Sequence, residues 1–400
     1  MKAINERKKL FWLFLALFLT GFFLRIWVAQ FGYNQDFVSW QNALALIQQN
    51  KSLFETGDFT YAPIFAYVLS ILDSIPLSFL ENNSFVQDFP GSLFRIKLIV
   101  FLSLVDFSIF FALYKKYSLK IGLLFFLNPI CIVITGHHNQ FNNFGILLAF
   151  LAVLLYQKNQ SQKDPINFKF IFPLIIMGLS LATKHILIFF PLWWAFKEKK
   201  LIKKFLTLFV PYFVFVLSFW DYLPGDSEYI IEKFFGGWWH ATGPFWGMFA
   251  PKIVHMYFDL HTLFNLSIIG LGFLLVNKSL RESFYLYLMA VVIFSSMMYP
   301  QYLVIPVLAM AIYWNWKFLT ITILTSLLFL IEPDEMNIHF LQELFNWDLR
   351  FTRIALHPII LILLIAFVEI AIGPKKFNLY LKKSYTFLKD KIKSSLYFKF

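Results

Sequence analysis

Long apolar segments recur along the chain and constrain its fold more than any other feature. The first, residues 10–30, is about 20 residues long, enough for an α-helix to cross roughly 30 Å of hydrocarbon. Its apolar core is too long for a signal peptide, and no small-residue cleavage site follows it. Further apolar segments lie at 94–114, 119–136, 141–157, 169–183, 186–196, 203–220, 260–277, 283–298, 301–315, 318–331 and 351–372. These segments predict an all-α, polytopic integral membrane protein.

The balance of residue types agrees with this class. Hydrophobic residues make up 59% of the chain and charged residues only 14%, too few polar side chains to cover a soluble globule. A net charge of +12 would suggest nucleic acid in a soluble protein. Here, however, the basic residues cluster at the ends of apolar segments, which is typical of membrane topology. We therefore expect no nucleic-acid partner. The single Cys131 cannot form an internal disulfide.

The distribution of basic residues predicts which loops are cytoplasmic. The apolar stretch 63–75 is either a further span or a helix on the membrane surface. With residues 2–9 inside, the remaining lysines and arginines fall inside only if 63–75 does not cross. Its shortness, Asp73 and Pro76 also favour a surface helix. The basic residues that decide this are Lys115, Lys116, Lys120, Lys158, Lys163, Lys197, Lys199, Lys200, Lys278, Arg281, Lys375 and Lys376.

The result is about twelve spans with both termini in the cytoplasm. Residues 1–372 form a single transmembrane domain, within which 31–93 is the first outer loop, and 373–400 form a basic cytoplasmic tail beside anionic lipid. Lys51 is the only lysine or arginine of the first outer loop. The loops expected on the non-cytoplasmic face are 31–93, 137–140, 184–185, 221–259, 299–301 and 332–350.

Asp36 lies a few residues beyond the first span. After it, Phe37, Trp40, Leu44 and Ile47 recur at helical spacing, which predicts an amphipathic helix lying on the membrane. Asp36 would stand at the start of this helix. There it could cap the helix by accepting backbone N–H bonds, or it could act as a base for a polar substrate that arrives at the water interface.

Two further polar stretches fall on the same predicted face. In "ITGHHNQFNNFG", residues 134–145, His137, His138 and Gln140 supply neutral donors and acceptors that suit sugar hydroxyls. A plain polar turn is the alternative. A metal site is a third interpretation, but adjacent histidines seldom point at one ion from a tight turn, so we predict no metal.

Lys184 and His185 separate two apolar segments at that face. A cation in this position needs an anion such as phosphate, or else it extends to the interface beside the lipid headgroups. Arg25, near the outer end of the first span, has the same two interpretations.

The motifs "QDFVSW", "YAPI", "GHHNQFNN" and "ATKHILIFFPLW" follow one another in an order that resembles GT-C glycosyltransferases. The nearest resemblance is to the dolichyl-phosphate-glucose-dependent α-1,3-glucosyltransferases of N-glycan assembly. In that family an outer-loop aspartate is followed four residues later by a tryptophan, as Asp36 and Trp40 are here. A Tyr-Pro-Pro-Leu-like stretch then matches the segment that begins at Tyr61.

The later motifs extend the resemblance to roughly residues 30–195. A His-x-Gln-aromatic-Asn motif matches the segment from His138 to Asn142, and a lysine ahead of a short apolar run and a proline matches Lys184 and Pro191. Beyond this region, "GGWWHATGPFW" and "YPQYLVIPVL" are similar only in general terms. The second carboxylate that often stands beside the aspartate is absent, and His185 occupies a position where glutamine is expected.

The resemblance implies a GT-C-like fold and the transfer of a hexose, with glucose as the expected sugar, from a polyprenyl-phosphate donor. The acceptor would be a glycan or lipid-linked oligosaccharide on the non-cytoplasmic face of a bacterial inner membrane or the endoplasmic reticulum. The reaction would need no cofactor. Such chemistry requires a base, a cation for the departing phosphate and donors for the sugar hydroxyls. The predicted base is Asp36, the predicted donor-phosphate ligands are Lys184, His185 and Arg25, and the predicted sugar or acceptor ligands are His137, His138, Gln140, Tyr61 and Trp40.

A multi-pass transporter or flippase of a lipid-linked or small polar substrate is the alternative function. A transporter would be expected to carry polar residues near mid-bilayer and an internal repeat. Asp106 is the main buried acid, and the sequence contains no evident repeat.

Overall fold

The computed structural model describes residues 2–55, 59–159, 166–235, 243–249, 260–296, 298–332, 336, 338–345, 349–380 and 382–383. Every regular element within these ranges is helical, so the predicted all-α class is confirmed. Most of the predicted tail 373–400 lies outside the described residues, as does Lys163.

Among the described residues, three helices are long and apolar enough to cross a membrane. They are α1 (Lys2–Ala29) from Lys8 onward, α5 (Ser92–Lys116), and α20 (Leu349–Ile372) from Ile354 onward. A fourth candidate is the pair formed by α6 (Leu119–Phe126) and the segment Pro129–His138, which is bent by 46°. The bend has a local cause, because Pro129 has no N–H to continue α6 and Asn128 caps the next helix, α7 (Pro129–Val133).

The other predicted spans form shorter helices. At 1.5 Å per residue, a 16-residue helix reaches only about 24 Å, less than the roughly 30 Å of a bilayer core. The predicted number of about twelve spans is therefore not confirmed. These helices are α8 (Asn142–Asn159), α9 (Phe168–Thr183), α10 (Phe190–Ala195), α11 (Leu201–Leu217), α15 (Leu260–Leu274), α16 (Leu280–Ile293), α17 (Val307–Ile312) and α18 (Trp316–Ile331).

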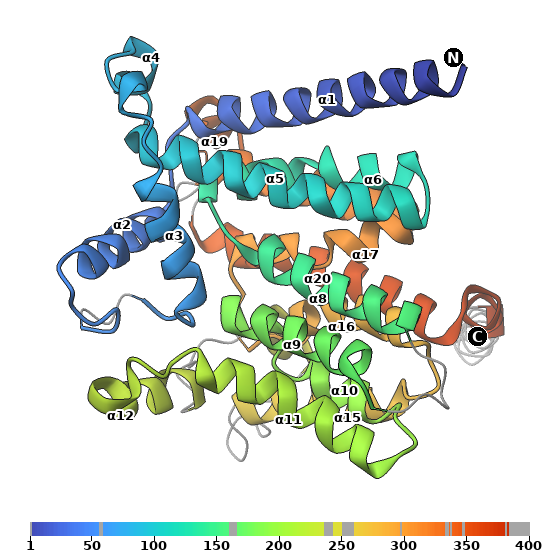
Figure 1. The fold of residues 1–400 in the computed structure, drawn as a ribbon. Coiled ribbons are helices and arrows are strands. Elements are labelled where there is room, and N and C mark those ends of the chain that lie inside the picture. Colours follow the sequence, from blue (N-terminus) through green and yellow to red (C-terminus); the bar gives the residue numbers. More distant parts are fainter. Residues whose placement is uncertain are drawn as a thin grey trace, which may run out of the picture.

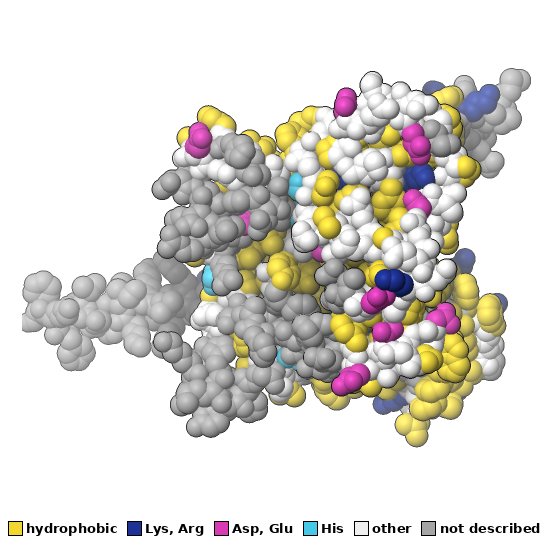
Figure 2. Space-filling view, turned by 90° about the vertical axis from the view of Figure 1, so that its left-hand side faces the viewer, with side chains coloured by type: hydrophobic (Ala, Val, Ile, Leu, Met, Phe, Trp, Pro, Cys, Tyr) yellow, Lys and Arg dark blue, Asp and Glu magenta, His cyan; other side chains and the backbone are white. Residues whose placement is uncertain are grey.

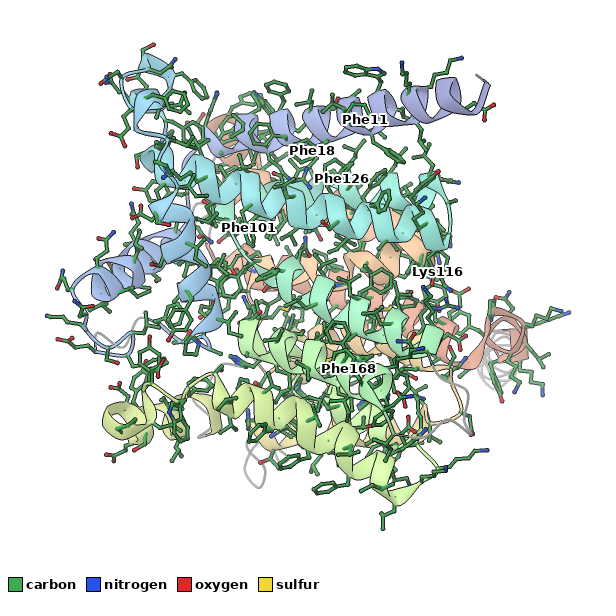
Figure 3. All side chains as sticks on the ribbon, viewed as in Figure 1. Phe11, Phe18, Phe101, Lys116, Phe126 and Phe168 are labelled. Atoms are coloured by element: carbon green, nitrogen blue, oxygen red, sulfur yellow. The ribbon has the colours of Figure 1, made fainter. Side chains whose placement is uncertain are left out.

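Large apolar side chains remain exposed on the outer helices. Phe11 of α1 and Phe168 of α9 are 60% and 71% exposed (Figure 3), and Leu201 of α11 is 82% exposed. Apolar surface of this extent is costly in water and is expected against lipid. The packing therefore agrees with the hydropathy of the sequence.

The two ends of the helix assembly differ. The start of α1 and the end of α20 lie at one end (Figure 1), where Lys116 also lies (Figure 3). The predicted first outer loop forms the opposite end, with α2 (Gln35–Gln48), α3 (Ile64–Ser74) and α4 (Ser84–Asp88). With 11 residues, α3 is too short to cross a bilayer, as predicted. Acidic side chains are scattered over the described surface at this end (Figure 2).

Smaller helices complete the described part of the chain. They are α12 (Leu223–Phe235), α13 (Pro244–Phe249), α19 (His339–Phe345), the π-helical turn η2 (Ile134–His138), and the 3-10 turns η1 (Ser78–Leu80), η3 (His185–Leu187) and η4 (Pro300–Val304).

Candidate functional site

Asp36 lies in the first turn of α2 and does not cap it. The cap is Asn34, whose extended backbone precedes the helix and whose Oδ1 accepts a hydrogen bond from the Asp36 backbone nitrogen at 3.1 Å. The Asp36 carboxylate is therefore free to make tertiary contacts. A carboxylate in the first turn is also stabilised by the unpaired N–H groups of the helix N-terminus.

Three amide groups surround the Asp36 carboxylate. Its Oδ2 accepts hydrogen bonds from Gln140 Nε2, from Gln301 Nε2 at 3.3 Å and from Asn34 Nδ2 at 3.4 Å. The side chain is half-buried, so water or a substrate can still reach it. All three hydrogen bonds converge on Oδ2, which leaves Oδ1 for a further partner.

Gln140 joins Asp36 to Lys184. While its Nε2 donates to Asp36, its Oε1 accepts a hydrogen bond from Lys184 Nζ at 3.0 Å. Gln140 follows the turn η2 and the left-handed residue Asn139, and Lys184 stands at the break between α9 and η3. The structure thus brings together three predicted site residues from three separate segments of the chain. The two contacts also determine the orientation of the Gln140 amide.

Lys184 is almost completely buried, with 2% of its surface exposed. Its ammonium lies 4.7 Å from the ring centre of Tyr61 and 5.0 Å from that of Phe141. Burial lowers the pKa of Lys184 to about 7, although nearby Asp36 opposes this shift. The ammonium is held by one neutral amide and two aromatic faces, with no ion pair to a described carboxylate. An anionic ligand would supply the missing counter-charge.

Tyr61 and Trp40 have different surroundings. Burial, reinforced by Asp36, raises the pKa of Tyr61, so its hydroxyl keeps its proton and remains a hydrogen-bond donor. Trp40 is fully buried and packs 5.2 Å from Tyr61, 5.1 Å from Phe141 and 5.4 Å from Phe65, measured between ring centres. It supports the Tyr61 and Phe141 rings, and none of its own faces is open to a sugar.

The three predicted histidines lie close to this cluster. His138 is buried, and its Nδ1 lies 2.8 Å from Asn34 Nδ2, so it contacts the residue that caps α2. His137 is also buried and precedes it in η2. His185 is half-buried and begins η3 directly after Lys184.

Arg25 does not join the cluster, which corrects its prediction as a phosphate ligand. Its guanidinium is fully buried and binds Asp106 Oδ2 through Nη2 at 2.7 Å and Nε at 3.2 Å. Asp106 also accepts hydrogen bonds from Thr135 at 2.7 Å and Asn143 at 2.6 Å. An arginine whose charge is already matched by a buried carboxylate is not available to a phosphate. This network instead ties η2 to α1, α5 and α8.

Arg95 also holds the turn in place, and sequence reasoning did not identify it. Its fully buried guanidinium donates to Asn139 Oδ1 at 2.7 Å and to the carbonyls of Gly32 at 2.5 Å, Gly136 at 3.0 Å and His137 at 3.2 Å. It donates in addition to the carbonyls of Ala29 at 2.9 Å and Pro90 at 3.0 Å. Arg95 therefore links the loop before Asp36 to the turn before Gln140. An arginine near the start of a predicted span was its only signal in the sequence.

Gln301 is the other residue that sequence reasoning missed. It lies in η4, and its backbone carbonyl also accepts a hydrogen bond from Asn142 at 3.4 Å. The segment "YPQYLVIPVL" that contains it was similar to the family only in general terms, so no role could be assigned from the sequence.

No metal site is formed by the side chains that the structure describes, since none of them make a group of three or more histidine, cysteine, aspartate or glutamate residues able to hold an ion. Comparison of the chain with protein-family models, curated proteins and solved structures found no match.

Proposed function

We propose that this protein is a membrane hexosyltransferase that uses a polyprenyl-phosphate-linked hexose, with glucose as the expected sugar. The observation that supports it best is the connection from Asp36 through Gln140 to Lys184. A carboxylate and a buried cation, joined through one amide, are the two charged groups that such a transfer needs. The acceptor is a glycan or lipid-linked oligosaccharide at the non-cytoplasmic face.

In the proposed reaction Asp36 is the general base. The amides of Gln140 and Gln301 hold Oδ2, and Oδ1 receives the proton of an acceptor hydroxyl. As that oxygen forms a bond to the anomeric carbon, the bond from this carbon to the phosphate oxygen breaks. The electron pair leaves with polyprenyl phosphate. The transfer is a single displacement with inversion, because a double displacement would need a nucleophile in addition to a base.

Lys184 neutralises the departing phosphate. Its present partner, the Gln140 carbonyl oxygen, is neutral, so exchanging this contact for phosphate adds a charge-assisted hydrogen bond. The Gln140 carbonyl oxygen can then accept a hydrogen bond from a sugar hydroxyl while its Nε2 stays on Asp36. Tyr61, which is half-buried and keeps its proton, supplies a further neutral donor to the sugar.

The experiment that tests this proposal compares Asp36→Asn with Asp73→Asn in purified protein supplied with polyprenyl-phosphate-glucose and an oligosaccharide acceptor. Asp73, on α3, is a matched control because it too accepts an amide hydrogen bond, from Gln48 at 2.9 Å. Loss of a general base should lower the rate by about 10²–10⁴-fold in Asp36→Asn, with little change in Asp73→Asn. Full activity of Asp36→Asn would remove the base assignment.

The same purified protein, reconstituted into vesicles, distinguishes a transferase from a flippase or transporter. A flippase or transporter would move labelled polyprenyl-phosphate-glucose across the bilayer without forming product. Lys184→Ala provides a second test of the transferase, since it should raise the KM for the donor far more than the KM for the acceptor. An unchanged donor KM would contradict the phosphate-binding role.

A further inference from the structure

An apolar groove lies between α6 and α18, and its lining contains none of the residues of the Asp36 cluster. Its volume is about 780 Å³, within the range of roughly 300–1,000 Å³ found for small-molecule sites. Leu123 and Leu127 line one wall, and Ile323 and Leu327 line the other. Lys120 and Trp314 belong to the same lining.

The break between α6 and α7 accounts for the groove. The chain bends by 46° at Asn128 and Pro129, so α7 packs against α18 while α6 packs against α5 and α17. The space between α6 and α18 therefore lies directly beside the proline break, and Asn128 and Pro129 belong to its lining.

Away from Lys120, the two hydroxyl groups of the lining already donate hydrogen bonds within their own helix, and the Asn128 side-chain carbonyl oxygen caps the next one. Thr322 Oγ1 donates to the Phe318 carbonyl at 2.9 Å, and Ser326 Oγ donates to the Thr322 carbonyl at 2.7 Å. Asn128 Oδ1 accepts from the Ile130 nitrogen at 3.0 Å. A polar ligand would lose its water and gain few free hydrogen-bond donors from the walls, whereas a hydrocarbon chain loses nothing. The walls therefore select an apolar chain.

The charged residues at one end of the groove indicate which headgroup the ligand carries. Lys120 is exposed, and it follows shortly after the exposed Lys115 and Lys116 that end α5. These lysines lie at the end of the assembly that holds the chain termini, as Lys116 does in Figure 3. Lysine and tryptophan together are typical of the headgroup level of a bilayer, and clustered lysines attract anionic lipid.

We propose that this groove binds an anionic phospholipid from the leaflet on the side of the chain termini, with one acyl chain between α6 and α18 and the phosphate at Lys120. The lipid replaces the contacts that α6 and α18 cannot make with each other. This inference does not depend on the proposed transferase activity.

Native mass spectrometry of the full chain in detergent tests the proposal with phosphatidylglycerol and phosphatidylcholine as probes. The wild-type protein should retain phosphatidylglycerol at least fivefold better than phosphatidylcholine. Ser326→Trp places an indole in the groove and should abolish that retention. Ser108→Trp is its matched control, because Ser108 is an exposed serine on α5 whose hydroxyl makes the same kind of bond, to the Leu104 carbonyl at 2.7 Å.

Lys120→Ala tests the headgroup contact without changing the groove walls. It should reduce retention of phosphatidylglycerol to the level of phosphatidylcholine, while Lys200→Ala, at another exposed lysine, should not. Equal retention by Ser326→Trp and Ser108→Trp would overturn the groove as the site. An unchanged lipid preference in Lys120→Ala would overturn the headgroup contact, and this result is independent of how well Ser326→Trp folds.

Discussion

Replacing Arg95 with lysine would test whether the Asp36 and Gln140 segments are held together by this one side chain. The guanidinium makes six hydrogen bonds to the chain, and they come from Nε, Nη1 and Nη2. Lysine keeps the charge but has only three N–H donors on one atom. Lysine can therefore bond at most half of these six acceptors. Its single nitrogen cannot reach acceptors that lie around the whole edge of the planar guanidinium.

The magnitude follows from the contacts that are lost. At about 1 kcal/mol of net stability for each hydrogen bond, the loss of three gives about 3 kcal/mol, and more if the buried carbonyls stay unpaired. Asn139, which has a left-handed backbone, would lose its Oδ1 contact to Arg95 and keep only the hydrogen bonds from its Nδ2 to the Thr135 and Gly136 carbonyls. Because Gln140 follows it, the rate of the proposed hexosyl transfer should fall at least tenfold as well.

Denaturant unfolding of the purified protein and the transferase assay measure the two effects. Arg281→Lys is the control, since Arg281 lies at the other end of the assembly with its guanidinium 5.7 Å from the Tyr117 ring centre, and it should change the free energy of unfolding by less than about 0.5 kcal/mol. If Arg95→Lys unfolds with the wild-type free energy and keeps its activity, the proposed link between the two segments is refuted.

Three further predictions concern charge, topology and stereochemistry. Burial lowers the pKa of Lys184 to about 7, so the cationic form predominates below that pH and is lost as the pH rises. The kcat/KM for the donor should therefore decline above about pH 7. Lys184→Arg keeps its charge at these pH values and should remove the decline. A profile flat from pH 6 to 9 would contradict a role for the cation. A cysteine introduced as Lys116→Cys should react with a membrane-impermeant reagent only from the cytoplasmic side, and labelling from outside would invert the topology. NMR of the product should show the anomeric configuration opposite to that of the donor, whereas retention would exclude a single displacement.

The local elements follow directly from the amino-acid pattern. Apolar residues at helical spacing predicted α2, and the shortness of 63–75 predicted that α3 is too short to cross a bilayer. The charge pattern placed Asp36, Gln140 and Lys184 on one face, and in the structure they meet. Helix formation and helix length depend on residues close together in the sequence. The hydropathy and spacing of those residues are therefore enough to predict them.

Only the tertiary structure shows which buried polar groups pair with one another. Arg25 and Lys184 are alike in sequence, each a single cation beside an apolar run. Yet Arg25 pairs with Asp106, 81 residues away, while Lys184 contacts only neutral groups within the described part of the chain. Gln301 reaches Asp36 across 265 residues, and Asn34 takes the helix cap that Asp36 could have occupied. The tertiary structure also shows that several predicted spans are short or broken helices. An apolar run specifies that a segment is buried, but only the packing of all the helices decides where it bends and which buried charge finds an opposite charge.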